Sequence, residues 1–194
     1  MANDVNRPPA DAVGRVACVG CGVIGGGWAA LFLARGHDVA AFAPSPAEEA
    51  PLRQLIETAW PSLERLGLAG GASPDRLTFT TDLGTAVGDA EFVQESVPED
   101  LGLKQRLFAD FDDLVPTDVV IASSTSGFAM TDIQADCRTA HRTVVGHPFN
   151  PPYIVPLVEV VGGTRTDAAA IDWLADFYTH IGKSVLRLDQ EVPG

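Results

Sequence analysis

The glycine-rich segment 20–25 (GCGVIG) restricts the fold more than any other part of this 194-residue chain. A short apolar run at 15–19 precedes it, and apolar residues at helical spacing follow it as far as Gly36. A second apolar run occupies 38–42. Glycines spaced in this way allow a buried strand to turn tightly into a helix that packs on it. The first 43 residues therefore predict a strand–turn–helix–strand unit.

Apolar runs and helical patterns continue to alternate after an interruption at 44–72. In the interruption we expect two helices, with Pro61 near the start of the second, forming an inserted helical hairpin. Further strands are predicted at 77–80, 92–95, 119–122, 143–146, 157–161 and 184–188, and helices from 82, at 101–114, 131–137 and 167–181. This order predicts one Rossmann-type α/β domain over 14–194, with a doubly wound, mostly parallel sheet, after a disordered tail over 1–13.

The composition excludes several classes of function. A net charge of −13 without a basic stripe disfavours nucleic-acid binding. The chain has no apolar run of membrane-spanning length and no secretory signal, so we expect a cytoplasmic protein. Cys18 and Cys21 have a C-x-x-C spacing, which suits redox or metal chemistry; packing in a strand and a glycine turn is the interpretation we favour. Four histidines without tight spacing argue against zinc, and no metal is expected.

The glycine segment also predicts a ligand. Gly20 permits the tight turn, Gly22 lets a pyrophosphate approach the backbone, and Gly25 lets the helix pack on the strand. The helix opens at Val23 and Ile24, where free N–H groups and the positive end of the helix dipole favour phosphate. A dinucleotide cofactor is therefore expected here.

The residues after the second strand bear on which dinucleotide binds. An acidic residue normally holds the adenosine ribose at this point, but the strand ends in Phe42, Ala43, Pro44 and Ser45. Ser45 could hydrogen-bond a ribose hydroxyl or leave room for a 2′-phosphate. The nearest basic residue is Arg53, so the sequence favours NAD over NADP.

Two segments carry candidate catalytic residues. His147 follows a predicted strand, and Glu159 lies within the apolar run LVEVV, where a carboxylate needs a hydrogen-bonding partner. Together they can form a general base for an alcohol proton, or merely a structural pair. Ser126, in the run SSTSG at a strand end, can hydrogen-bond a reacting oxygen; the alternative is a turn in which hydroxyls cap their own backbone.

Several motifs occur in a fixed order along the chain: VGCGVIG, QESVPE, SSTSG, HPFNP and PLVEVV. On these motifs the sequence resembles the NAD-binding domain of the 3-hydroxyacyl-CoA dehydrogenase family from residue 16 to 194. The resemblance implies an NAD-dependent dehydrogenase with His147 as catalytic base and Glu159 as its orienting partner. It also implies that Ser126 and Asn150 lie near the substrate and nicotinamide. Glu99 and Lys104 are implied to lie near the cofactor's ribose.

Two departures from the family pattern are visible. The family's acidic ribose ligand matches Ala43, and the last residues, 191–194 (EVPG), look like the opening of a segment that leads into a helical second domain. We therefore expect a fragment without the C-terminal helical domain, which carries dimer contacts and part of the substrate cleft. Such a fragment would bind cofactor but turn over slowly or not at all, whereas the longer protein would be a homodimer.

Three functions stay open from the sequence. The QESVPE and HPFNPPY segments look most like family members that oxidise small free hydroxy acids, such as carnitine or gulonate. The expected hairpin carries three arginines and five acids over 44–79. This net negative charge is unfavourable for binding the phosphates of coenzyme A. We therefore favour a carnitine-like hydroxy acid, with a 3-hydroxyacyl-CoA as the alternative substrate. A dinucleotide-binding module without catalysis is the third interpretation.

Overall fold

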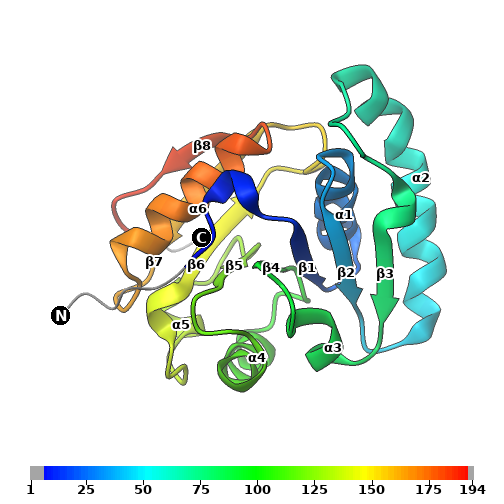
Figure 1. The fold of residues 1–194 in the computed structure, drawn as a ribbon. Helices are drawn as coiled ribbons and strands as arrows, with labels where there is room; N and C mark the ends of the chain where they lie inside the picture. Colours follow the sequence, from blue (N-terminus) through cyan, green and yellow to red (C-terminus); the bar gives the residue numbers. More distant parts are fainter. Residues whose placement is uncertain (1–6, 192–194) are drawn as a thin grey trace.

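The computed structural model describes residues 7–191, which form a layered domain around one eight-stranded sheet with the order β3-β2-β1-β4-β5-β6-β7-β8 (Figure 1). The strands are β1 (Arg15–Val19), β2 (Asp38–Phe42), β3 (Leu77–Thr80), β4 (Phe92–Glu95), β5 (Val120–Ser123), β6 (Thr143–Pro148), β7 (Leu157–Gly162) and β8 (Ser184–Arg187). Neighbouring strands run parallel except β6 and β7, which are antiparallel. The predicted doubly wound, mostly parallel α/β sheet is confirmed.

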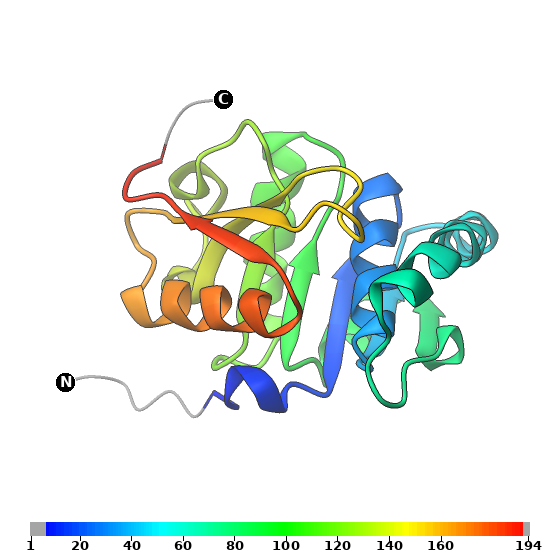
Figure 2. The same ribbon diagram turned by 90° about the horizontal axis from the view of Figure 1, so that it is seen from above.

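Helices cover both faces of the sheet (Figures 1 and 2). They are α1 (Val23–Ala34), α2 (Glu49–Leu66), α3 (Leu83–Val87), α4 (Leu101–Leu114), α5 (Met130–Ile133) and α6 (Ala168–His180), with short 3₁₀ turns η1 (Ala10–Ala12), η2 (Pro46–Glu48), η3 (Pro74–Arg76) and η4 (Ala140–Arg142). One core joins the sheet to α1, α2 and α6, and a second core joins it to α3, α4 and α5. The result is a three-layer sandwich.

Helix α1 is apolar on all sides because it lies between the sheet and α2. Every residue from Gly25 to Ala34 is buried, as expected for a helix packed on two sides. Trp28 stacks on Tyr178 of α6, with ring centroids 5.2 Å apart, and Phe92 of β4 contacts Phe177 at 4.7 Å. These aromatic contacts hold α1 and α6 against the centre of the sheet.

The expected helical hairpin at 44–72 is wrong. The structure has one continuous 18-residue helix, α2, with Pro61 inside it. The buried residues Leu52, Ile56, Ala59 and Leu63 form one stripe at helical spacing that passes through the proline. Pro61 itself is exposed, so its ring meets solvent, and packing of the stripe against α1 outweighs the hydrogen bond that proline removes.

The N-terminal segment also differs from the expectation of a disordered tail over 1–13. Residues 7–13 contact the domain: Arg7 Nε donates to the carbonyl of Asp118 at 2.9 Å, Trp173 Nε1 donates to the carbonyl of Pro8 at 2.8 Å, and Val13 is buried. Two long-range hydrogen bonds and a buried apolar side chain offset the entropy of ordering this segment. Residues 1–6 of the expected tail lie outside the described residues.

Candidate active site

The glycine turn lies where the strand order reverses. Strand β1 has β2 on one side and β4 on the other, so the connections after β1 and β4 leave the sheet in opposite directions. Gly20 has φ +100°, and a Cβ there would lie 2.5 Å from the Ser96 carbonyl oxygen. A Cβ at Gly25 would lie 1.8 Å from the Gly20 oxygen, whereas one at Gly22 would meet nothing within 4 Å. Two glycines are thus required by packing, and the third faces open space.

A cavity of about 730 Å³ opens beside this turn, and we call it the glycine-turn cavity. Its walls come from the turn and α1, the end of β2 with η2, the loop after β4, and α4; they are Gly20, Cys21, Gly22, Val23, Ile24, Phe42, Pro44, Glu48, Leu83, Ser96, Val97, Pro98, Leu103, Arg106, Leu107 and Asp110. The cavity lies at the carboxyl end of parallel strands, where open α/β sheets bind ligands. Its apolar walls and bare backbone suit a nucleotide.

A second cavity, of about 240 Å³, adjoins the first and shares Ile24, Ser96 and Val97 with it. We call it the central cavity; Glu99, Lys104, Ser124 and Ser126 complete its lining. The predicted residues Glu99, Lys104 and Ser126 are therefore brought together here. Their common location follows from the topology, because β4 and β5 are neighbours and their C-terminal loops meet.

Glu99 ties two loops of the central cavity together. Its Oε1 accepts hydrogen bonds from Thr125 Oγ1 at 2.5 Å and from the backbone N–H groups of Ser126 at 3.0 Å and Gly127 at 3.1 Å. Partial burial raises the pKa of Glu99, but these hydrogen bonds and the Lys104 ammonium outweigh burial and leave the pKa lowered. Glu99 is thus held as a carboxylate.

Lys104 lines the central cavity but is almost fully buried, although the resemblance implies a role near the ribose. Its Nζ lies 2.8 Å from Glu95 Oε1 and 3.3 Å from Glu99 Oε2. Glu95 also accepts hydrogen bonds from Ser123 Oγ and the N–H of Val97, both at 2.6 Å. Burial raises the pKa of the Glu95 carboxyl, and Lys104 with the two donors opposes that rise. The geometry gives Lys104 a structural task, holding two carboxylates.

The sequence did not single out Ser124, which forms part of the central cavity. Ser124 Oγ accepts from Gln94 Nε2 at 2.9 Å and from Trp28 Nε1 at 3.2 Å, and it lies 2.8 Å from Ser96 Oγ. Gln94 Oε1 in turn accepts from the Tyr178 hydroxyl at 2.6 Å. A buried glutamine inside strand β4 was the available signal, because a buried amide needs partners.

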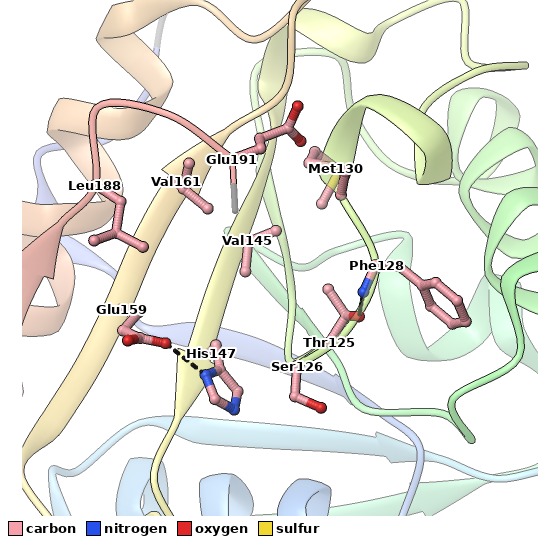
Figure 3. Close-up of a pocket in the computed structure, with 11 residues that line it drawn as sticks. Thr125, Ser126, Phe128, Met130, Val145, His147, Glu159, Val161, Leu188 and Glu191 are labelled. Carbon is pink, nitrogen blue, oxygen red and sulfur yellow. Dashed lines mark hydrogen bonds and ion pairs between the residues drawn. The ribbon is translucent and has the colours of Figure 1, made fainter. Parts of the chain in front are cut away.

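The sheet register places His147 directly opposite Glu159. The two residues are partners in the antiparallel pairing of β6 and β7, so their side chains lie on the same face. His147 Nδ1 is 2.8 Å from Glu159 Oε2, and Figure 3 shows the ring between Glu159 and Ser126. The carboxylate accepts from Nδ1–H, so Nε2 carries the lone pair. This arrangement can accept a proton from a hydroxyl group.

The pair lines a third, small cavity of about 60 Å³, which we call the histidine cavity. It shares Ser126 with the central cavity, so the three cavities form one row along the carboxyl edge of the sheet. Sequence reasoning assigned no role to Glu191, yet Glu191 lines this cavity (Figure 3). Its carboxylate accepts hydrogen bonds from the N–H and hydroxyl of Thr131. No local pattern marks Glu191, because the contact spans 60 residues.

Two predicted residues do not line these cavities. Ser45 Oγ accepts from the N–H of Ala47 at 3.3 Å and begins η2, and Ser45 does not line the glycine-turn cavity. Asn150 is exposed in the loop after β6 and is not part of the histidine or central cavity. The roles suggested for Ser45 and Asn150 stay predictions.

The cysteines are buried free thiols. Cys21 Sγ lies 3.4 Å from the carbonyl oxygen of Phe42, and burial with the nearby charge of Glu48 raises the pKa of Cys21 to about 12. A thiol so rarely ionised is a poor nucleophile and metal ligand. Within residues 7–191, no cluster of three or more His, Cys, Asp or Glu side chains could hold a metal ion. None of the described helices is long and apolar enough to cross a bilayer.

Comparison with known proteins identifies the family. The family model described as "3-hydroxyacyl-CoA dehydrogenase, NAD binding domain" matches residues 15–192. This chain belongs to the 3-hydroxyacyl-CoA dehydrogenase family. The resemblance drawn from the sequence motifs is therefore confirmed, and NAD is the cofactor of the matching domain.

Relatives within the 3-hydroxyacyl-CoA dehydrogenase family are close. The L-carnitine dehydrogenase of Streptomyces griseus is 63% identical over 182 residues, which cover 94% of this chain and 54% of the relative. The L-carnitine dehydrogenase of Bacillus cereus is 46% identical over 190 residues, which cover 98% of this chain and 58% of the relative. The chain thus spans little more than half the length of these relatives.

Solved structures of dehydrogenases share the fold. The NAD⁺-dependent 5-formyl-3-hydroxy-2-methylpyridine 4-carboxylic acid 5-dehydrogenase superposes with a TM-score of 0.87 at 32% identity, over 94% of this chain and 59% of the other. The 3-hydroxybutyryl-CoA dehydrogenase of Escherichia coli superposes with a TM-score of 0.83 at 29% identity, over 90% of this chain and 38% of the other.

The glycine-turn cavity fits the cofactor of the 3-hydroxyacyl-CoA dehydrogenase family. The open space beside Gly22 leaves room for a pyrophosphate against the backbone, and no side chain caps the N-terminus of α1 there. The row of cavities then leads from this turn toward His147. Gly20, Gly22, Val23, Ile24 and Gly25 would hold the phosphates.

Proposed function

We propose that this chain is the cofactor-binding part of an NAD-dependent dehydrogenase that oxidises the 3-hydroxyl of a small hydroxy acid, carnitine or a close analogue. The observation that carries the proposal is the His147–Glu159 hydrogen bond, in a cavity that the central cavity links to the glycine-turn cavity through shared lining residues. A base beside a nicotinamide site is the arrangement that alcohol oxidation needs.

The roles of the residues follow from their positions. Oxidation removes a proton from the hydroxyl oxygen and a hydride from its carbon, and leaves a ketone. NAD, when bound, supplies the hydride acceptor. His147 Nε2 takes the proton, while Glu159 fixes the ring and stabilises the positive charge that develops on it. Ser126, which lines both the central and the histidine cavities, donates a hydrogen bond to the reacting oxygen.

Charge supports a small acid rather than a coenzyme A thioester. Of the three arginines in 44–79, Arg53 pairs with Glu49 at 2.8 Å and Arg76 pairs with Asp38 at 3.1 Å. Arg65 donates to the Ser62 hydroxyl. With two of its three arginines paired with carboxylates and a net charge of −2 (three arginines, five acids), the segment 44–79 offers little positive charge to a polyanion. The relatives named as L-carnitine dehydrogenases favour the same substrate class.

Single-turnover oxidation, followed by NADH fluorescence with protein in excess over substrate, tests the proposal. We expect L-carnitine to be oxidised faster than 3-hydroxybutyryl-CoA, and His147→Gln to abolish NADH formation while NAD affinity is retained. Faster oxidation of the thioester would replace the small-acid proposal with the family's acyl-CoA activity. NAD binding without oxidation of either substrate, both in this chain and in a protein extended to the length of the L-carnitine dehydrogenases, would favour a module without catalysis. The homodimer of the longer protein and its cytoplasmic location stay predictions.

A further inference from the structure

The ribose side of the glycine-turn cavity lacks the acidic residue that is usual after the second strand. Ala43 occupies that position and is fully buried, so it offers neither a carboxylate nor an exposed surface. In dinucleotide-binding folds a carboxylate at this place accepts hydrogen bonds from the adenosine ribose hydroxyls. Another group must make this interaction if the chain is to hold the ribose.

Glu48 brings a carboxylate to the same wall. It lines the cavity together with Phe42 and Pro44, although it lies five residues beyond Ala43 in the chain. The 3₁₀ turn η2 returns the chain to the cavity: Ser45 Oγ accepts from the N–H of Ala47, and the N–H of Glu48 donates to the Ser45 carbonyl at 3.1 Å. The backbone of Glu48 is therefore fixed.

The carboxylate of Glu48 is available for a ligand. Among the described residues no side chain or backbone group hydrogen-bonds it or forms an ion pair with it, whereas neighbouring Glu49 is occupied by Arg53 at 2.8 Å. Much of the surrounding wall is apolar, including Phe42, Pro44 and Leu83. A half-buried carboxylate beside apolar side chains gains most from ligand hydroxyls that donate to it.

We propose that the Glu48 carboxylate accepts hydrogen bonds from the adenosine ribose of NAD and thereby selects NAD over NADP. The 2′-phosphate of NADP would place an anion against this anion and would remove the 2′-hydroxyl donor. Two other charged side chains line the cavity from α4: Arg106, which could pair with a 2′-phosphate, and Asp110, an exposed carboxylate. The inference rests on NAD binding, and it is independent of the substrate.

Titration calorimetry of the full chain with NAD, NADP and ADP-ribose tests this role. Glu48→Gln should weaken the binding of NAD and of ADP-ribose about tenfold or more, because hydrogen bonds to a charged acceptor are among the strongest. NADP affinity should stay equal or rise, and Glu48→Lys should reverse the preference. The matched control Glu49→Gln, at the adjacent residue outside the cavity, should leave all three Kd values within about twofold.

Defined results would overturn the inference. Equal NAD and ADP-ribose affinities in the wild type and Glu48→Gln would exclude Glu48 as the ribose ligand, and so would an equal loss for NAD and NADP. Thermal unfolding of both variants checks that the fold is retained. If the wild type binds NAD and oxidises L-carnitine but Glu48→Gln is unchanged, only this inference fails. If the wild type binds no NAD, the proposed function fails with it.

Discussion

Replacing Lys104 with methionine tests the buried charge cluster behind the central cavity. Methionine keeps much of the apolar stem of lysine but removes the ammonium. Glu95, with no exposed surface, then keeps only its hydrogen bonds from Ser123 Oγ and Val97 N–H. Glu99 loses a contact as well, but it is partly exposed and keeps three other donors.

The expected cost is dominated by Glu95. Removing one partner of a buried ion pair typically destabilises a protein by about 3–5 kcal/mol, because the remaining charge is uncompensated. In a domain of this size, each kcal/mol lowers Tm by about 2–4 °C, so Lys104→Met should lower Tm by roughly 6–20 °C. Glu95→Gln combined with Lys104→Met removes the charge as well, and it should recover most of that loss.

Urea unfolding followed by circular dichroism, at several pH values, measures the effect. Burial raises the pKa of Glu95 above its ordinary value of 4.5, so the folded state holds this proton more readily than the unfolded state. Loss of Lys104 raises the pKa further. The penalty should therefore shrink as pH falls and Glu95 takes up its proton in the folded variant.

The matched control is Arg106→Met, at an exposed position two residues further along the same helix. It should change the free energy of unfolding by about 0.5 kcal/mol or less. A loss in Lys104→Met no larger than in this control, or a penalty that does not depend on pH, would refute the assignment of Lys104 as counter-ion to a buried carboxylate.

Three further predictions concern other parts of the chain. Gly22→Ala should weaken NAD binding about tenfold or more, as measured by calorimetry, and leave Tm nearly unchanged, because its Cβ enters open space at φ −67°. Gly25→Ala should instead lower Tm. Equal NAD affinity in Gly22→Ala and the wild type would contradict this prediction. Glu159→Gln should lower kcat about 10²–10⁴-fold at unchanged NAD affinity, because His147 loses the carboxylate that orients it. A kcat equal to that of the wild type would show that the His147–Glu159 pair is only structural. Burial lowers the pKa of His37 below 6.5, so the unfolded state binds this proton more readily than the folded state. The free energy of unfolding should therefore fall as pH drops below 6.5. His37→Asn should make that fall shallower in urea titrations, and the same pH slope as in the wild type would contradict the prediction.

Much of the architecture was predictable from the sequence because its signals are local. Each strand of the parallel sheet is a short apolar run between turn residues. The spacing of Gly20, Gly22 and Gly25 predicts the geometry of the glycine turn. The charge pattern of His147 and Glu159 also carries local information, because a carboxylate in an apolar strand needs a partner. These inferences required no knowledge of which strands are neighbours.

The helix α2 shows where local rules mislead. Pro61 predicts a break, and the expected hairpin followed from that rule. The apolar stripe that includes Leu52 and Leu63 continues on both sides of the proline, and it is buried against α1. Tertiary packing adds its free energy along the whole stripe, so it exceeds the local cost of one lost hydrogen bond.

The sequence by itself determined the order of the strands, the helices outside 44–72, the glycine turn, and the need of Glu159 for a partner. Only the tertiary structure decided that β6 and β7 pair with His147 opposite Glu159, that Lys104 is buried beside Glu95, and that Glu48 returns to the cavity wall. The physical reason is range. Propensity and hydrophobic period act between neighbours in the chain, whereas hydrogen bonds and ion pairs depend on distances that only the assembled sheet and loops set.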